Sequence, residues 1–286
     1  MTFNPNADIS GGKASKRGRT TGLAIGGGGL GVLALVLLSQ FLGVDLTGLV
    51  GGQPQQQVEE QSLERCQTGA DANADIECRM KGASASLDDY WSRALEGYTS
   101  PTDLVMFDDA TATGCGNATS ATGPFYCPTD QTIYLDTDFY GELSSRFGAS
   151  GGPLAEMYVV AHEWGHHIQN LLGTLESTRD GQTGADSNAV RVELQADCFA
   201  GAWVADASTT TDDAGQAFFE PVTEAQIDEA LSAAAAVGDD RIQQASQGYV
   251  DPHTFSHGTS EQRQRWFMAG YDGGPGSCDT FAASFL

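Results

Sequence analysis

Three segments of the chain carry apolar residues at helical spacing, and two shorter segments have the composition of strands. The helical segments are residues 84–98, 153–172 and about 186–205. The strand-like segments, residues 104–107 and 132–135, lie between the first and the second of them. A helix, a group of strands and then further helices is the order expected of an α+β domain with a small sheet.

The longest uncharged stretch lies near the N-terminus. Residues 20–44 contain no charged side chain, and residues 23–44 are rich enough in apolar side chains to cross a bilayer once. Four basic residues precede this run, whereas Asp45 follows it, so the positive-inside rule predicts a cytoplasmic N-terminus. A cleaved signal peptide is the alternative, which the length of the run and the lack of an Ala-x-Ala site disfavour.

These patterns divide the chain into four parts. We expect a disordered cytoplasmic N-terminus over residues 1–20, one transmembrane helix over 21–44 and a flexible linker over 45–64. Residues 65–286 remain as an extracytoplasmic domain, long enough to bury a single sizeable core. The predicted partners therefore include a lipid bilayer, through one helix.

Charge narrows the range of partners. The formal net charge is −24, and Lys81 is the only lysine after the apolar run. A surface this acidic repels nucleic acid and anionic lipid headgroups, so no nucleic-acid partner is expected.

All six cysteines follow the apolar run, and an even count outside a membrane favours disulfides. Six cysteines allow 15 pairings, which sequence does not choose between. Short loops favour two of the pairs and leave a third: Cys66 with Cys78, Cys115 with Cys127, and Cys198 with Cys278. Free thiols or a zinc–cysteine site are the alternatives, and the absence of a CxxC pair disfavours the latter.

The strongest chemical signal is the HExxH pentapeptide of residues 162–166, inside the second helical segment. His162 and His166 are four residues apart and lie on one face of a helix, so both imidazoles can bind one metal ion. Glu163 lies beside them and can take a proton from a metal-bound water and pass it to a leaving amine. Hydrogen-bonded core histidines are the alternative, which the intervening glutamate disfavours. The pentapeptide predicts a zinc site with the chemistry of peptide-bond hydrolysis.

A third ligand is expected on the helical segment 186–205. Glu193 and Asp197 share one face there, among small and apolar residues that indicate burial. One carboxylate can bind zinc while the other accepts the second ring N–H of a ligand histidine. A solvated acidic face is the alternative.

The segments HEWGHHIQ (162–169) and ELQADCFAG (193–201) together resemble the bacterial neutral zinc metallopeptidase family, membrane-anchored proteins of the zincin type. Residues 115–128, 133–136 and 257–267 share the resemblance, which extends from about residue 66 to the C-terminus. It implies a zincin-like α+β metallopeptidase domain with a small sheet and an HExxH helix, in the cell membrane of a bacterium.

The resemblance also implies roles for single residues. One zinc ion would be held by His162, His166 and Glu193, with Glu163 as general base and Asp197 behind a histidine. More distant gluzincin peptidases share the HExxH and ExxAD arrangement, which favours Glu193 over Asp197 as the ligand.

A late histidine and one strand are further candidates. His257 could stabilise the oxyanion of a tetrahedral intermediate or close the site as a fourth ligand. Arg263 and Arg265 follow it and are interpreted first as partners of surface acids. Residues 132–135 are a candidate edge strand for an extended peptide, or an ordinary core strand. His167 points away from the metal face and is expected to pack in the core.

Three functions fit these observations. The first is a membrane-anchored zinc peptidase that hydrolyses extracytoplasmic proteins or peptides. The second is a zinc hydrolase of another amide, such as a peptidoglycan cross-link. The third is a non-catalytic zinc-binding protein, or one latched by His257, against which the presence of Glu163 argues.

Overall fold

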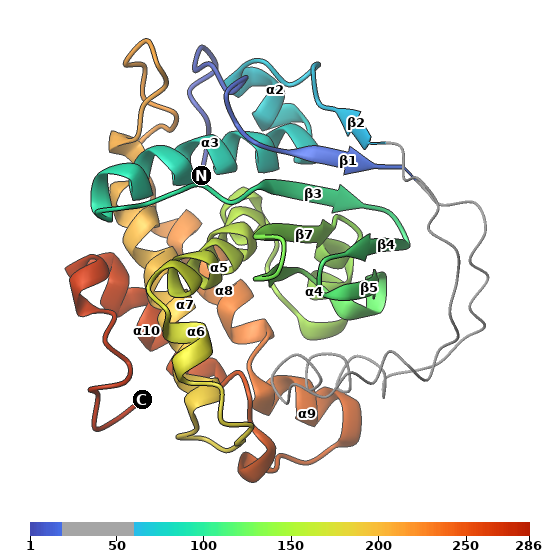
Figure 1. The fold of residues 1–286 in the computed structure, drawn as a ribbon, viewed down its shortest axis with the longest axis vertical. Helices are drawn as coiled ribbons and strands as arrows, with labels where there is room; N and C mark the ends of the chain where they lie inside the picture. Colours follow the sequence, from blue (N-terminus) through green and yellow to red (C-terminus); the bar gives the residue numbers. More distant parts are fainter. Residues whose placement is uncertain (19–59) are drawn as a thin grey trace.

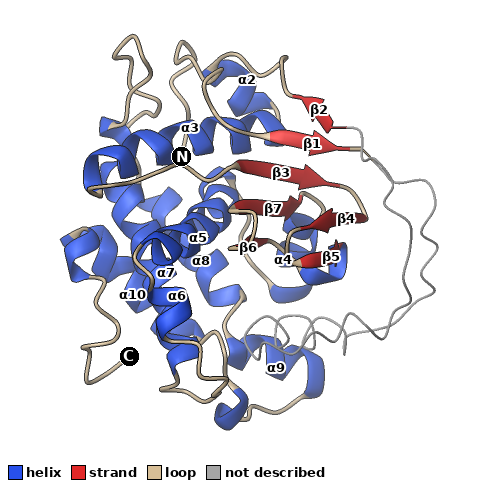
Figure 2. Ribbon diagram, in the orientation of Figure 1, coloured by secondary structure: helices blue, strands red, loops and turns tan. Residues whose placement is uncertain are grey.

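The computed structural model describes residues 1–18 and 60–286. In this part of the chain a five-stranded sheet and a small hairpin lie on one side, and helices cover the other (Figure 1, Figure 2). Both helices and strands contribute to one hydrophobic core. The fold is therefore mixed α and β, as the order of predicted elements indicated.

The sheet has the strand order β2-β1-β3-β7-β6. Its strands are β1 (Ser15–Arg17), β2 (Glu60–Ser62), β3 (Asp103–Phe107), β6 (Phe125–Cys127) and β7 (Thr132–Asp136). β3 is parallel to β1 and β7, whereas β6 is antiparallel to β7. The segment 132–135, a candidate edge strand or an ordinary core strand, is thus β7, which lies inside the sheet. The core-strand alternative is correct and the edge-strand alternative is wrong, because the edge beyond β7 is formed by β6.

A hairpin lies beside this edge. It consists of β4 (Ala110–Thr113) and β5 (Gly116–Thr119), paired in antiparallel register. The disulfide between Cys115 and Cys127 ties the turn of the hairpin to the end of β6.

The described helices vary from single turns to five turns. They are α2 (Gly69–Ala74), α3 (Ile76–Ala94), α4 (Phe139–Phe147), α5 (Pro153–Leu171), α6 (Thr174–Ser177), α7 (Asn188–Asp206), α8 (Glu224–Ala236), α9 (Asp239–Gln247) and α10 (Ser260–Gly273). Pro153 occupies the first turn of α5, where its missing N–H costs nothing. Ser187 caps α7 by accepting the backbone N–H of Val190.

Glycines let three helices approach closely, with α7 between α5 and α10. A Cβ on Gly165 of α5 would lie 2.9 Å from the Cα of Ala196 on α7. A Cβ on Gly270 of α10 would lie 1.8 Å from the carbonyl oxygen of Cys198. No other residue fits at these two crossings without moving a helix. This close approach brings the carboxylates of α7 to the histidines of α5.

The N-terminal residues belong to the same core. Met1, Phe3 and Ile9 are buried, and Phe3 packs against the ring of Phe219. β1 pairs with both β2 and β3, and its last residue, Arg17, is opposite Glu60. The expectation of a disordered N-terminus is therefore wrong for residues 1–18.

This packing also bears on the predicted topology. Residues 1–18 and 60–286 share one sheet and one core, so both lie on the same side of any membrane. A cytoplasmic N-terminus and an extracytoplasmic domain do not fit together with this fold. The segment 21–44 and most of the predicted linker lie outside the described residues. Among the helices of residues 1–18 and 60–286, none is long and apolar enough to span a bilayer.

The three disulfides have the pairing that loop length favoured. Cys66 is bonded to Cys78, and Cys198 to Cys278, in addition to the hairpin disulfide. The last of these fastens α7 to the C-terminal segment across 80 residues of sequence.

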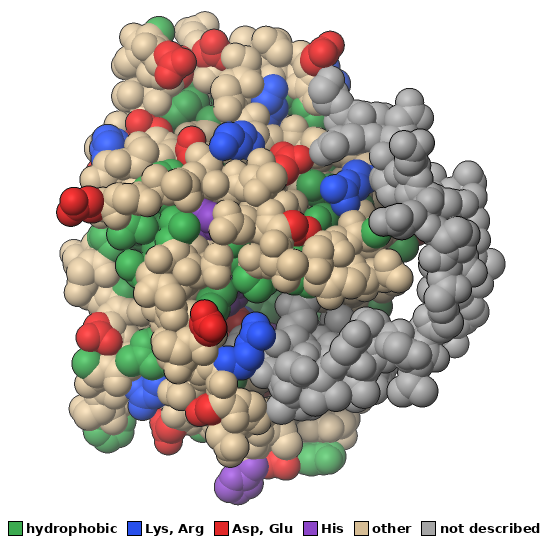
Figure 3. Space-filling model, in the orientation of Figure 1, with side chains coloured by type: hydrophobic (Ala, Val, Ile, Leu, Met, Phe, Trp, Pro, Cys, Tyr) green, Lys and Arg blue, Asp and Glu red, His purple; other side chains and the backbone are tan. Residues whose placement is uncertain are grey.

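Surface charges are interspersed. On the face drawn in Figure 3, Lys and Arg side chains stand singly among Asp and Glu. Several form exposed pairs one helical turn apart, such as Arg93 with Asp89 and Arg146 with Glu142. Pairs of this kind contribute little to stability, so the fold depends mainly on its core.

Candidate metal centre

Helices α5 and α7 bring two histidines and one glutamate together. His162 Nε2 lies 3.2 Å from Glu193 Oε2, and His166 Nε2 lies 3.5 Å from Glu193 Oε1. One donor atom from each of the three residues lies within 4.8 Å of the others. The three side chains are between 5 % and 13 % exposed. The predicted ligands thus form one buried cluster at the crossing of the two helices.

The chemistry of this cluster fits zinc. Bonds of about 2 Å to a tetrahedral zinc ion separate neighbouring donor atoms by about 3.3 Å. The separations of 3.2 Å from His162 to Oε2 of Glu193 and of 3.5 Å from His166 to Oε1 lie close to that value. Two imidazoles and one carboxylate also leave a fourth position for water, as in catalytic zinc sites. A second group, Cys66, Asp75 and Cys78, is excluded because its sulfurs form a disulfide.

Asp197 lies behind the first histidine, one turn along α7 from Glu193. Its Oδ1 is 2.8 Å from Nδ1 of His162, on the side of the ring opposite Glu193. Such a bond directs the other ring nitrogen, Nε2, toward the metal position. The structure therefore places Asp197 where the paired carboxylates of this helix predicted it.

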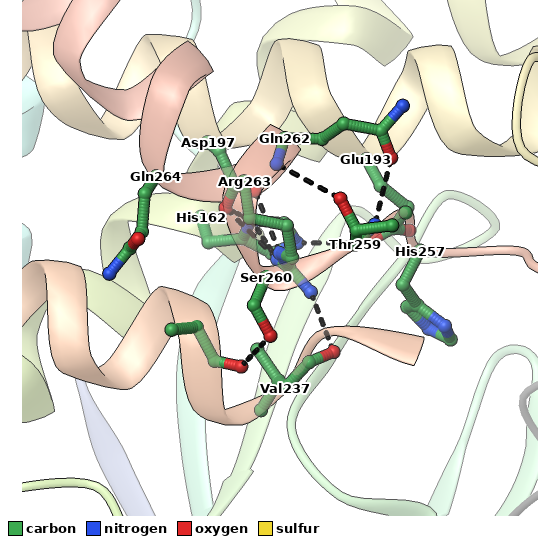
Figure 4. Close-up of polar contacts among 12 residues, drawn as sticks. His162, Glu193, Asp197, Val237, His257, Thr259, Ser260, Gln262, Arg263 and Gln264 are labelled. Atoms are coloured by element: carbon green, nitrogen blue, oxygen red, sulfur yellow. Dashed lines mark hydrogen bonds and ion pairs between the residues drawn. The ribbon is translucent and has the colours of Figure 1, made fainter. Parts of the chain in front are cut away.

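Two residues that the sequence did not assign to the site complete the surroundings of Asp197. Arg263 of α10 donates from Nε to Oδ2 at 2.8 Å and from Nη2 to Oδ1 at 2.9 Å (Figure 4). The Tyr158 hydroxyl of α5 also donates to Oδ1. Asp197 is fully buried and Arg263 is 2 % exposed, so a surface ion pair is the wrong interpretation for this arginine.

Charge pairing outweighs burial in this cluster. Burial alone would raise the pKa of Asp197, but Arg263 and His162 hold that pKa below its ordinary value. Burial would likewise lower the pKa of His162, whereas Asp197 raises it to about 10. The pKa of Glu193 lies well below its usual range because the field of His166 and His257 overcomes desolvation. Asp197 and Glu193 are therefore carboxylates at neutral pH.

Glu163 differs from these two acids. Burial raises its pKa above the ordinary value, and the nearby His166 and His162 offset only part of that shift. A hydrogen bond from the backbone N–H of Tyr126, in edge strand β6, also lowers the pKa of Glu163. Glu163 thus lies between the ligand histidines and the sheet edge, with a raised affinity for protons.

His257 reaches the cluster from the loop before α10. It lies beside Glu193 (Figure 4), but it is not a member of the group of three donors. Its Nδ1 is 3.2 Å from Asp239 Oδ1. Burial would lower the pKa of His257, and Glu193 and Asp239 together raise it.

Asp239 holds the loop that carries this histidine. Its Oδ2 accepts the backbone N–H groups of Ser256, His257 and Gly258, at 2.8, 2.7 and 3.0 Å. Thr259 then caps α10 through a reciprocal pair of bonds with Gln262. Asp239 therefore fixes the loop backbone as well as the imidazole ring.

The remaining candidates lie outside the cluster. His167 contacts the Tyr126 hydroxyl at 3.0 Å and the Thr99 carbonyl at 2.7 Å, as expected of a packing residue. Arg265 pairs with Glu261 on the surface, in agreement with its interpretation.

Comparisons with known proteins cover nearly the whole chain. The family described as "Putative neutral zinc metallopeptidase" matches residues 5–281. An uncharacterized protein of Mycobacterium tuberculosis is 49 % identical over 254 residues, which are 87 % of this chain and 86 % of that protein. The uncharacterized protein YpfJ of Escherichia coli is 43 % identical over 274 residues, 92 % of this chain and 89 % of that protein.

No solved structure matches this chain. The family match includes the N-terminal residues from position 5 onward, which the structure places in the core. It also includes every residue of the cluster on α5, α7 and α10. The chain therefore belongs to the neutral zinc metallopeptidase family.

Proposed function

We propose that this protein is a zinc-dependent metallopeptidase that hydrolyses peptide bonds of proteins or peptides. His162, His166 and Glu193 hold one zinc ion, and Glu163 is the general base. The observation that carries the proposal is the buried group of three donors, His162, His166 and Glu193, with a second acid, Glu163, beside it. A structural zinc site has no need of such a base.

Each side chain of the site has a separate role in the reaction. When bound, zinc would supply a Lewis acid that polarises the substrate carbonyl and lowers the pKa of water. Glu163 takes the proton of the attacking water and gives it to the departing amine, a task that suits its raised pKa. His257, held by Asp239 and carrying a raised pKa, donates a hydrogen bond to the developing oxyanion.

The edge of the sheet offers a place for the substrate backbone. An extended peptide can add to a sheet by main-chain hydrogen bonds at an edge strand. β6 is one of the two edge strands of the described sheet, and its Tyr126 lies beside Glu163. We assign substrate pairing to β6, which replaces the earlier candidate at residues 132–135.

The compartment is also part of the proposal. Three disulfides favour an oxidising environment outside the cytoplasm. Because residues 1–18 complete the sheet, we propose that they lie on the same extracytoplasmic side as the catalytic residues. The apolar residues 21–44 are the part of the sequence suited to a bilayer.

The test is hydrolysis of unfolded casein by the full chain and by Glu163→Gln, with the zinc content of both measured. We expect about one zinc per chain in both proteins, with cleavage by the parent alone. Zinc in both without cleavage would favour another amide substrate, such as a peptidoglycan cross-link, or a latched protein. Parent protein that binds no zinc would contradict the proposal.

A further inference from the structure

An amide side chain orients the second ligand histidine. Nδ1 of His166 lies 2.8 Å from Oε1 of Gln169, less than one turn along α5. Gln169 is fully buried, although it is neither a zinc donor nor part of the apolar core. His162, in contrast, faces the carboxylate of Asp197. The two ligand histidines therefore have supports of different charge.

Backbone carbonyls fix which way the Gln169 amide points. Its Nε2 donates to the carbonyl oxygen of Val192 at 2.7 Å and to Gln195 Oε1 at 3.1 Å. A carbonyl oxygen can only accept, so the NH₂ group must face Val192 and Oε1 must face His166. An amide oxygen also only accepts, which requires a proton on Nδ1 of His166. Nε2 of that ring is then the atom directed at Glu193 and the metal position, 3.5 Å from Glu193 Oε1.

A second amide extends this arrangement to the C-terminal segment. Gln195 donates from Nε2 to the carbonyl oxygen of Cys278 at 2.9 Å, which turns its own Oε1 toward Gln169. Cys278 is bonded to Cys198, three residues beyond Gln195 on α7. A hydrogen-bonded chain thus leads from the disulfide through two amides to His166.

We propose that Gln169 is a positioning residue of the metal centre, which presets His166 with its proton on Nδ1 and Nε2 toward the metal, and that Gln195 and the Cys198–Cys278 disulfide hold Gln169 in this orientation. The proposal rests on the proposed function in one respect, the role of His166 as a zinc ligand. Mutation of a residue that hydrogen-bonds to a ligand histidine commonly lowers metal affinity by about 10- to 100-fold.

The first test compares two substitutions of similar volume in the full chain. Gln169→Met offers only a weakly accepting thioether sulfur, whereas Gln169→Glu keeps an oxygen acceptor for Nδ1–H. Competition with a chelator should show that the zinc dissociation constant rises about 10- to 100-fold in Gln169→Met. The zinc dissociation constant of Gln169→Glu should stay within several-fold of the parent value. Gln216→Met, at an exposed glutamine of the loop before α8, is the control and should leave zinc affinity unchanged.

Two results would overturn the proposal. Equal losses in Gln169→Met and Gln169→Glu would mean that the oxygen acceptor at position 169 does not set the zinc affinity. Parent-like affinity in both would mean that the amide does not position the ligand.

The second test needs no substitution and no zinc. Nitrogen-15 spectra of the histidine rings in the metal-free parent should show a proton on Nδ1 of His166. A bare Nδ1 would contradict the proposal even if every variant failed to fold. A parent that shows this proton but binds no zinc would contradict the proposed function and leave the orienting role of Gln169 intact.

Discussion

At the level of single residues, the candidate metal centre depends on the hydrogen bonds that the two carboxylate oxygens of Asp197 accept. Oδ1 accepts hydrogen bonds from His162, Tyr158 and Nη2 of Arg263. Oδ2 accepts a hydrogen bond from Nε of the same guanidinium. The Asp197 carboxylate and the Arg263 guanidinium are both buried away from water. Each charge would strongly destabilise the fold if the other were absent.

Arg263→Met should therefore destabilise the protein strongly. The methionine fills most of the space but leaves the Asp197 carboxylate without its charged partner, at a cost of about 3–5 kcal/mol. Arg265→Met, two residues away in an exposed pair with Glu261, should change stability by less than about 0.5 kcal/mol. Urea unfolding of both variants checks the difference, and similar values for the two would contradict the buried pair.

Asp239→Asn should alter the pH dependence of stability. The pKa of Asp239 is lowered: burial would raise it, but the bonds to His257 and to backbone N–H groups outweigh burial. A lowered pKa adds stability above the ordinary Asp pKa, and that stability is lost as pH falls through the folded value. At pH 6 the variant should be less stable than the parent by about 1–3 kcal/mol. This difference in the free energy of unfolding should become smaller below about pH 4. A difference that does not change with pH would contradict this account.

The sequence predicted which donor residues lie together better than it predicted the residues that hold them in place. His162, Glu163 and His166 are related by local helix geometry, which a five-residue pattern carries. Arg263 and Asp239 act through contacts across 66 and 18 residues, and nothing in their local sequence distinguishes them from surface charges. Gln169 could have been found, because a polar residue three positions after a ligand histidine lies within its reach on a helix.

At the level of helices and strands, the crossing of α5 and α7 sets the distance between the ligands. Gly165 stands in the HExxH segment at the point where Ala196 approaches. The histidines and Glu193 come from different helices, so any widening of this crossing separates the donor atoms.

Gly165→Ala should widen the crossing. Its Cβ would meet backbone atoms of Ala196, at 2.9 Å from Cα and 3.0 Å from O, which cannot move independently of α7. We expect a loss of about 1–3 kcal/mol in stability together with weaker zinc binding. Gly141→Ala in α4, which has open space around the added methyl, should instead gain up to about 1 kcal/mol. Thermal unfolding and zinc titration of the pair measure both effects.

The sequence located the long helices more accurately than the sheet. The apolar period of residues 153–172 corresponds to α5, because a buried helix repeats one pattern over five turns. α3 begins at Ile76, eight residues before the predicted segment 84–98, because Asp75 caps it. Strand order is set by pairing between distant segments, which explains why the interior position of β7 did not follow from its alternating residues.

For the protein as a whole, the N-terminal residues change the expected organisation. Residues 1–18 are mostly polar, and isolated apolar residues such as Phe3 and Ile9 carry no periodic signal. Their burial depends on a surface made by α3 and the loop that contains Phe219, and no sequence pattern links these segments. Disorder was therefore a reasonable but wrong prediction.

Because residues 1–18 pack against residues 60–286, exposed positions in both segments should be labelled from the same side of a membrane. Ser10 and Ser246 are exposed, and their replacement by cysteine leaves the disulfides in place. In intact cells, a membrane-impermeant maleimide should label Ser10→Cys and Ser246→Cys alike, because both lie on one side. Labelling of Ser246→Cys alone would restore the single-pass topology with a cytoplasmic N-terminus.

Phe3→Ala should show whether residues 1–18 stabilise the rest of the described chain, residues 60–286. Removing this buried ring should cost about 3–5 kcal/mol, whereas Asn6→Ala at an exposed position nearby should be nearly neutral. Urea unfolding measures both, and equal stability of the two variants would mean that the N-terminus is not part of the core.

The most direct measurement is the zinc content of the purified full chain beside Glu193→Gln and Glu163→Gln. Glu193 is the third donor, whereas Glu163 lies next to the donors without being one of them. We predict about one zinc in the parent, about one in Glu163→Gln and a large loss in Glu193→Gln. Retention of full zinc by Glu193→Gln, or its absence from the parent, would contradict the metal centre described for α5 and α7.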